Sequence, residues 1–199
     1  MARSGRTTKG GTREEIVRVA VALFSEHGYA ATSLDDIAAE VGIRKPSLYY
    51  YIDSKEDLLY EINEILAREL LETASELIAE VEGAGEKLRA FLRAAMRLVA
   101  ARQKEVTIFV GERHMLKSRS PRWREIAERR ATYEGMVEGI IADGMASGEF
   151  VELPVNLTAL GVLGTIANAS IWYRRDGSME PDEIADLFAD MLLRGVEPR

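Results

Sequence analysis

Residues 32–59, TSLDDIAAEVGIRKPSLYYYIDSKEDLL, predict two short helices joined by a tight turn and followed by the start of a third helix. Ser33 can cap the first helix, and Asp36 three residues later completes a capping box. Apolar residues then recur at helical spacing as far as Val41. Gly42 follows them, and its backbone freedom suits the sharp turn between the two short helices.

The second short helix is expected to have a buried side and an outward side. Leu48 and Ile52, four residues apart, can anchor it against the first helix. At 100° per residue, the outward residues are Pro46, Ser47, Tyr49 and Tyr50. Three cations flank them: Arg44, Lys45 and Lys55. This combination suits a helix lying in a DNA major groove, whereas three consecutive tyrosines, 49–51, cannot all pack into one core.

Four motifs in this stretch point to a known family. They are the T-S-L-x-x-I-A run, the Gly-Ile turn, the Ser-Leu-Tyr-Tyr-Tyr helix and the Ser-Lys-Glu-x-Leu start of the next helix. Over residues 13–59 the chain therefore resembles the TetR family of transcriptional repressors. The resemblance implies a homodimer that binds a palindromic double-stranded DNA operator and is released by a small hydrophobic effector.

The resemblance also assigns roles to individual residues. The residues expected to face bases are Lys45, Pro46, Ser47 and Tyr50. The residues expected to meet phosphates are Thr32, Ser33, Tyr49, Tyr51 and Lys55. Two positions depart from the family pattern: Asp35 stands where many members place a basic or neutral residue, and Arg44 stands where Ser or Thr often caps the second helix.

The distribution of charge agrees with a DNA-binding end. The chain of 199 residues has a net charge of −7, but residues 1–55 hold eight basic against seven acidic side chains, and the rest hold 18 against 26. The first thirteen residues hold Arg3, Arg6, Lys9 and Arg13 among Gly, Ser and Thr, with no acidic residue. The N-terminus is therefore either a basic arm that meets DNA or a terminus with incidental charge. No apolar run follows it, which predicts a cytoplasmic protein without a secretory signal.

Hydrophobic periodicity predicts an all-α fold of about nine helices. The TetR resemblance implies that it divides into a helix-turn-helix domain at residues 1–55 and a larger ligand-binding and dimerisation domain at 56–199. Outside the two short helices, the expected helices span residues 12–28, 55–82, 86–103, 105–116, 121–147, 155–174 and 181–194. The helix from Lys55 is long enough to belong to both domains. The 47% hydrophobic content is ample for a packed core.

The last two expected helices predict a dimer interface. The uncharged run 153–173 is long enough to span a bilayer, but its polar residues favour a helix buried among protein and no membrane association. One side of it is smooth enough to admit another helix closely, and it pairs with the stripe of the last helix. The expected interface residues are Leu160, Gly161, Gly164, Ala167, Ile184, Leu187, Phe188 and Met191. The alternative is burial of both helices within a larger monomer core.

The central helices offer candidates for an effector pocket, which the TetR resemblance places among them. The expected ligand residues are Phe91, Met96, Phe109, His114, Tyr133, Met136, Asn168 and Trp172. A stripe of Met and aromatic residues is as readily explained as core. The Trp-Tyr-Arg-Arg run at 172–175, with its Gly-Ser-x-x-Pro turn, resembles the branch that responds to fatty acyl-CoA. The alternative is a regulator with another small-molecule effector.

Six cations could receive the phosphates of such a ligand, or could form a solvated helix face: Lys117, Arg119, Arg122, Arg124, Arg129 and Arg130. No cofactor is expected. Because there is no cysteine, cysteine metal sites and disulfides are excluded. We also find no phosphate-binding loop, nucleophile elbow or paired-ligand spacing, so an enzyme is not predicted. An architectural DNA-binding protein does not fit the acidic body of the chain.

Overall fold

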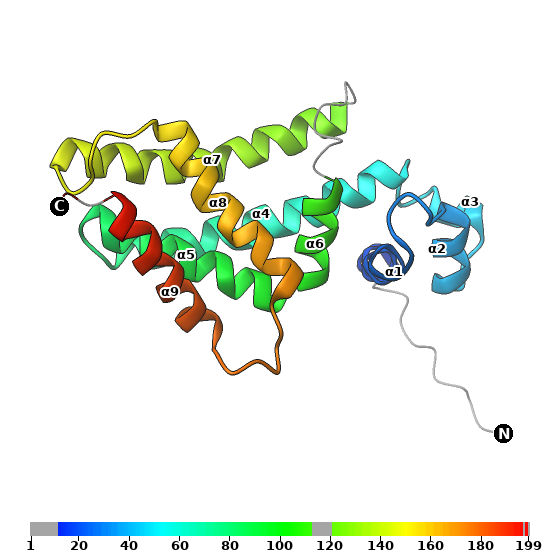
Figure 1. Cartoon of the computed structure of the whole chain (residues 1–199). Helices are drawn as coiled ribbons and strands as arrows, with labels where there is room; N and C mark the ends of the chain where they lie inside the picture. Colours follow the sequence, from blue (N-terminus) through cyan, green and yellow to red (C-terminus); the bar gives the residue numbers. More distant parts are fainter. Residues whose placement is uncertain (1–11, 113–120, 197, 199) are drawn as a thin grey trace.

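A small bundle of three helices lies at one end of the molecule, and the long helix α4 joins it to a larger helical body (Figure 1). The computed structural model describes residues 12–112, 121–196 and 198, and within these ranges it contains nine helices and no strand, which confirms the predicted all-α class. The helices are α1 (Thr12–His27), α2 (Leu34–Val41), α3 (Lys45–Leu48), α4 (Lys55–Ala79), α5 (Ala84–Ala101), α6 (Gln103–Glu112), α7 (Pro121–Ser147), α8 (Val155–Trp172) and α9 (Pro181–Val196).

The local signals of the small bundle act as the sequence predicts. Ser33 and Asp36 form a reciprocal capping box at the start of α2. Gly42 ends α2 in the left-handed conformation, with φ of 76°, which only glycine adopts without strain. Helix α3 is shorter than expected, at four residues, because the chain tightens into turns after Leu48. Leu48 and Ile52 are nevertheless both buried against the bundle core.

Helix α4 contributes to both parts of the molecule. A second capping box, formed by Ser54 and Asp57, starts it next to α3. Leu58 is buried in its first turn, and Leu70 is buried three turns later in the larger body. Along its 25 residues α4 packs against α1, α5, α6 and α7. The domain boundary predicted at residue 55 therefore coincides with the first residue of a helix that both parts share.

A contact between distant residues sets the start of α5. The helix begins at Ala84, two residues before the expected start, because the Glu149 carboxylate accepts hydrogen bonds from the backbone N–H groups of Ala84 at 2.8 Å and Gly85 at 3.3 Å. A carboxylate at this place satisfies free N–H groups and meets the positive end of the helix dipole. These N–H groups also keep the pKa of Glu149 below its ordinary value.

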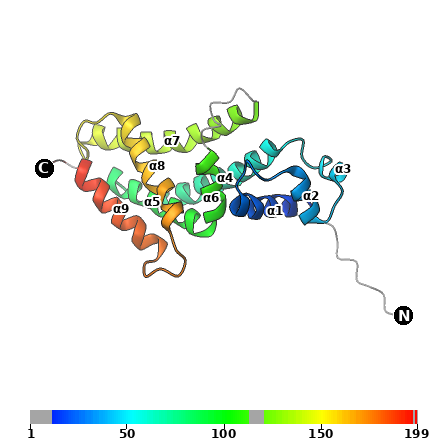
Figure 2. The same cartoon turned by 45° about the vertical axis from the view of Figure 1, so that its right-hand side comes forward.

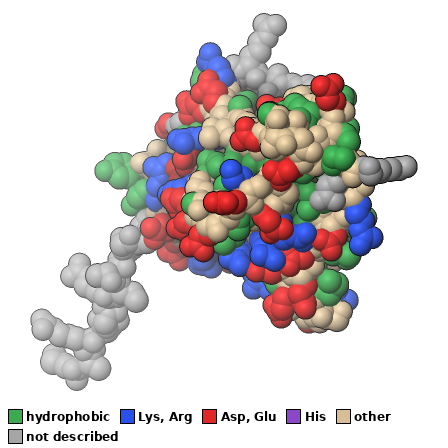
Figure 3. All heavy atoms as spheres, turned by 90° about the vertical axis from the view of Figure 1, so that its left-hand side faces the viewer, with side chains coloured by type: hydrophobic (Ala, Val, Ile, Leu, Met, Phe, Trp, Pro, Cys, Tyr) green, Lys and Arg blue, Asp and Glu red, His purple; other side chains and the backbone are tan. Residues whose placement is uncertain are grey.

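Three Arg–Asp ion pairs join α5 to α9. Each helix contributes one residue per turn, and the pairs are Arg89 with Asp190, Arg93 with Asp186, and Arg97 with Asp182, at 2.6 to 2.8 Å. The guanidinium of Arg93 contacts Asp186 through two nitrogens, which lowers the pKa of that carboxyl. Acidic and basic side chains are interspersed across the end of the molecule farthest from α1–α3 (Figure 3).

Helix α8 crosses the larger body over α5, α6 and α7, as the two ribbon views agree (Figures 1 and 2). Its 18 residues are long and apolar enough to span a membrane by length and composition alone. One side of it packs into the body, and Ala159 and Ala169 are buried there. The other side is open to solvent, where Leu157 is 66% and Ile171 is 68% exposed.

The ion pairs between α5 and α9 predict a loss of stability in acid. The lowered pKa of Asp186 means that its charge stabilises the fold above the ordinary value of 3.8, and that this contribution is lost as pH falls through the lowered value. Asp186→Asn should cost about 1 kcal/mol at pH 7. In urea denaturation, the difference from the unmodified protein should shrink below pH 3.8. Asp143→Asn, at an exposed position on α7, should change little at either pH.

Candidate DNA-binding surface and ligand cavity

The residues predicted to face bases form one exposed surface on α3 and the turn after it. Lys45, Pro46 and Ser47 are exposed, and Tyr50 is the most exposed large hydrophobic side chain of the described residues, at 85%. Leu48 points the other way and is fully buried, so α3 presents a polar and aromatic face on an apolar base. This is the arrangement that a helix needs to enter a major groove.

The rest of this surface comes from the residues on either side of α3. Arg44 and Tyr49 are exposed, and the ring of Tyr51 packs edge-on against Tyr50 with the centroids 5.3 Å apart. Arg44 makes no side-chain cap at the start of α3. Its guanidinium therefore remains on the surface beside the outward face.

Asp35 forms an ion pair with the α3 cation. Its carboxylate lies 2.7 Å from the Lys45 Nζ, and both side chains are largely exposed. The hydrogen bond to Asp35 raises the pKa of Lys45. An exposed pair of this kind is weak, so Lys45 can exchange Asp35 for a base or phosphate at small cost. The departure from the family pattern at Asp35 thus provides a partner for Lys45.

Two residues predicted to meet phosphates point into the protein instead. Thr32 is buried, and its hydroxyl donates to the carbonyl of Gly28 at 2.9 Å. The Lys55 amine donates to the carbonyls of Tyr29 at 2.6 Å and Thr32 at 2.8 Å, and lies 4.3 Å from the centre of the Tyr29 ring. Both residues fasten the loop between α1 and α2. Ser33 is exposed, but its hydroxyl belongs to the capping box of α2.

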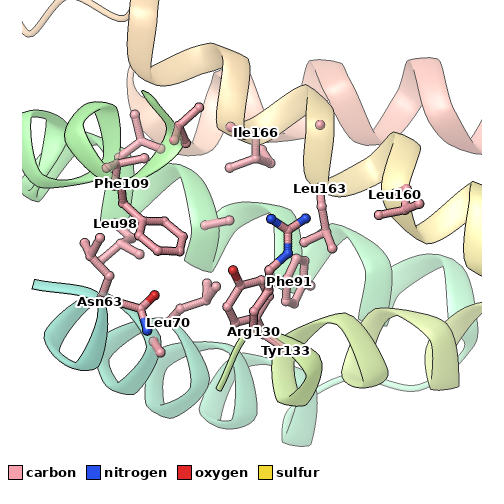
Figure 4. A pocket seen from close by; sticks show the side chains of 18 residues that line it. Asn63, Leu70, Phe91, Leu98, Phe109, Arg130, Tyr133, Leu160, Leu163 and Ile166 are labelled. Atoms are coloured by element: carbon pink, nitrogen blue, oxygen red, sulfur yellow. The ribbon is translucent and has the colours of Figure 1, made fainter. Parts of the chain in front are cut away.

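A cavity of about 330 Å³ lies between helices α4 and α8, with all five helices from α4 to α8 in its wall (Figure 4). Its lining is mostly aliphatic and aromatic. Three lining residues carry polar side chains, namely Asn63 on α4 and Arg130 and Tyr133 on α7. A concave apolar site with a few polar groups is the usual form of a small-molecule site.

The cavity includes three of the predicted ligand residues and leaves out four. Phe91, Phe109 and Tyr133 line it. The residues outside the lining are Met96, Met136, Asn168 and Trp172. At 100° per residue, each of these lies roughly 90–160° around its helix from the mean direction of the lining residues on that helix. Met96 is buried in the core, whereas the exposed Trp172 packs edge-on against Phe188. His114 lies outside the described residues.

Sequence reasoning missed Asn63 and named Arg130 only among the six cations that could receive ligand phosphates. It assigned three α8 residues of the lining to the dimer interface alone: Leu160, Gly164 and Ala167. The sequence pattern around Asn63 could have identified it. It lies on the apolar stripe of α4 that Leu59, Leu66 and Leu70 form, where a polar residue needs an explanation. Leu160 and Gly164 line the cavity and are also exposed, so the cavity reaches the surface beside them.

The polar groups of the cavity differ in their surroundings. Burial raises the pKa of Tyr133 to about 12, so its hydroxyl stays protonated at neutral pH. Arg130 forms an ion pair with Glu134 one turn later on α7. Asn63 Nδ2 is buried, and no described residue accepts a hydrogen bond from it. Among the six cations predicted to receive phosphates, Arg129 pairs with Glu64 at 3.1 Å. Lys117 and Arg119 lie outside the described residues. The N-terminal cations Arg3, Arg6 and Lys9 also lie outside them.

Comparison with protein families agrees with both parts of the molecule. A model of the bacterial regulatory proteins of the tetR family matches residues 16–62, and a model of the Tetracyclin repressor-like C-terminal domain matches residues 82–196. The chain belongs to the TetR family. It is therefore a DNA-binding transcriptional regulator and not an enzyme. The predicted helix-turn-helix domain and larger C-terminal domain are confirmed.

Individual relatives match this TetR-family chain along nearly its whole length. The HTH-type transcriptional repressor KstR2 of Rhodococcus jostii is 28% identical over 94% of this chain and 92% of its own. The fatty acid metabolism regulator protein of Bacillus subtilis is 26% identical over 92% of this chain and 94% of its own. Among solved structures, AibR in complex with isovaleryl coenzyme A and operator DNA has a TM-score of 0.79 and 27% identity, over 92% of this chain and 98% of that one.

The position of Lys55 predicts a structural effect rather than an effect on phosphate contacts. Lys55→Met should cost about 2 kcal/mol in urea denaturation, because it removes hydrogen bonds from an ammonium to part-buried carbonyls. Lys45→Met, at the exposed pair, should leave stability nearly unchanged. If Lys55→Met instead reduced the salt dependence of DNA binding by about one unit, Lys55 would be a phosphate contact after all.

Proposed function

We propose that this TetR-family regulator represses transcription as a homodimer on a palindromic operator in the cytoplasm, and that an acyl-CoA releases it by filling the cavity with its acyl group. The observation that carries the proposal is the cavity itself. One of its walls is α4, the helix that begins beside α3 and contacts α1. A ligand in the cavity therefore touches an element that also positions the DNA-binding surface.

A dimer is supported by the apolar stripe that α8 and α9 leave open. The most exposed side chains of this stripe are Leu157, Leu160, Ile171, Trp172, Leu187 and Met191. Gly161 and Gly164 lie among them with nothing within 4 Å of an added Cβ, which leaves room for another helix. Ile184 is the exception among the predicted interface residues, because it is buried within the subunit. A two-fold contact between such stripes would cover them and would adjoin the cavity beside Leu160.

The route from cavity to DNA is proposed to run through α6 as well as α4. Val106, Phe109 and Val110 of α6 line the cavity, and α6 also packs against α1. A ligand that pushes on these residues displaces the small bundle directly. To release DNA it must bind the displaced arrangement more tightly than the DNA-bound one.

An acyl group suits the cavity better than a whole acyl-CoA does. The volume of about 330 Å³ lies at the lower end of the range of 300–1,000 Å³ that is usual for ligand sites. We therefore place a short or medium acyl group inside and the nucleotide outside, where Arg124 is exposed. This narrows the fatty acyl-CoA expected from the sequence to one with a short or medium acyl group. It agrees with AibR, whose solved complex contains isovaleryl coenzyme A.

The exposed face of α3 predicts that a substitution there weakens binding to the operator more than binding to random DNA. Tyr50→Ala should weaken operator binding by about 1–3 kcal/mol and leave binding to random DNA nearly unchanged, because Tyr50 is exposed on α3 and is expected to face bases. Fluorescence anisotropy at fixed salt with both DNAs measures this. Glu40→Ala, on the exposed side of α2, is the control. Equal losses on both DNAs would place Tyr50 on phosphate.

The proposed dimer predicts that a charged residue in its interface lowers the mass of the particle in solution. Met191→Glu should produce monomers at micromolar concentration, because it would bury an unpaired charge against the partner. Sedimentation equilibrium distinguishes the two states. Ser75→Glu, at an exposed position on α4, should leave the mass unchanged. A monomeric parent protein would contradict the proposed dimer.

The effector proposal predicts release of the operator by a thioester. Isovaleryl-CoA to decanoyl-CoA should lower operator affinity by about 5- to 150-fold at saturation. Ala95→Phe fills the cavity and should abolish the response with operator binding intact, whereas Ala127→Phe, exposed on α7, should keep it. Unchanged affinity with every thioester would overturn the acyl-CoA assignment and leave the DNA-binding function standing.

A further inference from the structure

One polar group in the cavity wall has no hydrogen-bond partner in the part of the chain that the structure describes. Asn63 is 1% exposed, and its Nδ2 finds no hydrogen-bond acceptor among the described residues. Its side chain lies on the cavity side of α4, together with Leu66 and Leu70 (Figure 4). A leucine would fill this place without leaving a donor unpaired, so the amide lowers the stability of the empty protein.

The other polar groups of the lining can also donate. The Tyr133 hydroxyl and the Arg130 guanidinium come from α7, which packs beside α4 and faces the cavity with it (Figure 4). No lining residue carries a carboxylate. The polar part of the cavity is therefore rich in donors and suits a ligand oxygen that accepts hydrogen bonds.

The exposure of the lining gives the cavity an orientation. Within one subunit, Leu160 is 42% exposed and the side chain of Arg130 is 26% exposed. Because the proposed dimer contact covers Leu160, Arg130 marks the end of the cavity that reaches the surface. Asn63, by contrast, is 1% exposed and lies away from the surface. An acyl group that entered from the surface would bring its far end, and not its thioester, close to the Asn63 amide.

We infer that the effector carries a carbonyl oxygen on the buried part of its apolar body, and that Asn63 Nδ2 donates a hydrogen bond to it. The inference rests on the proposed function of the cavity and narrows the ligand class from saturated acyl groups to oxo-substituted ones. A saturated chain would leave the donor unpaired inside the complex, whereas a carbonyl supplies the missing acceptor. A site that hydrogen-bonds a ligand group discriminates strongly against the analogue that lacks it.

Two matched probes test the inference without DNA: butylbenzene and 4-phenylbutan-2-one, in which a carbonyl replaces one methylene. Isothermal titration of the full chain gives the ratio of their dissociation constants, and the change of this ratio on mutation cancels their different hydration. Asn63→Leu, which replaces the amide with an apolar group of the same branching, should shift the ratio by about tenfold in favour of butylbenzene. Leu66→Met, an apolar change one turn away, should leave the ratio unchanged.

The free protein provides a second readout. Asn63→Leu should raise the melting temperature, because it removes an unpaired donor from an apolar wall, whereas an amide with a structural role would lower it. If Asn63→Leu does not fold, Asn63→Ala serves for the comparison of ratios. An unchanged ratio, or no binding of either probe to the unmodified protein, would overturn the inference.

The operator assay separates this inference from the acyl-CoA proposal. If no thioester releases DNA but the probe ratio still shifts, the acyl-CoA assignment fails and the role of Asn63 stands. If saturated thioesters release the unmodified protein and Asn63→Leu equally well and the ratio is unchanged, the effector class stands and the role of Asn63 fails. Support for both requires 7-oxooctanoyl-CoA to be more potent than octanoyl-CoA on the unmodified protein and to lose that advantage in Asn63→Leu.

Discussion

The continuous helix α4 is the constraint on which the rest of the structure depends. Its 25 residues begin at a capping box beside α3 and end in the larger body, with no break in between. Leu58 is buried on the side of the small bundle and Leu70 lines the cavity. A continuous helix moves as a rigid body more easily than it bends. We therefore expect a displacement of one end of α4 to move its other end. Helix α4 is thus an element that the DNA-binding surface and the cavity share.

The helices around α4 differ in how firmly they are held. Helix α9 is fixed to α5 by three Arg–Asp pairs on successive turns, and α5 is capped by Glu149 from beyond α7. Helix α6, by contrast, is short and packs against both α1 and α8. The helices joined by these ion pairs, α5 and α9, lie on the side of the cavity that α5 forms. The wall that adjoins the small bundle is the shorter element, which suits a movable part.

Helix α8 is apolar on two sides that have different surroundings. Helix α8 contributes to the cavity with Leu163 and Ile166, and to the open stripe with Leu157 and Ile171. A helix that is apolar on every side needs cover on every side, and within one subunit only the inner side of α8 receives it. The hydrophobicity of α8 alone did not show which of its sides lines the cavity and which is open to solvent.

The sequence by itself determined the fold class, the caps of α2 and α4, the turn at Gly42 and the outward face of α3. These features depend on residues within a few positions of each other, and such short-range signals can be read from spacing. Tertiary structure alone decided which sides of α5, α7 and α8 meet around the cavity. Met96 and Phe91 are equally apolar, but a difference of five residues turns one into the core and the other into the cavity. The inward role of Lys55 likewise required the carbonyls of Tyr29 and Thr32, which the chain brings to it from more than twenty residues away.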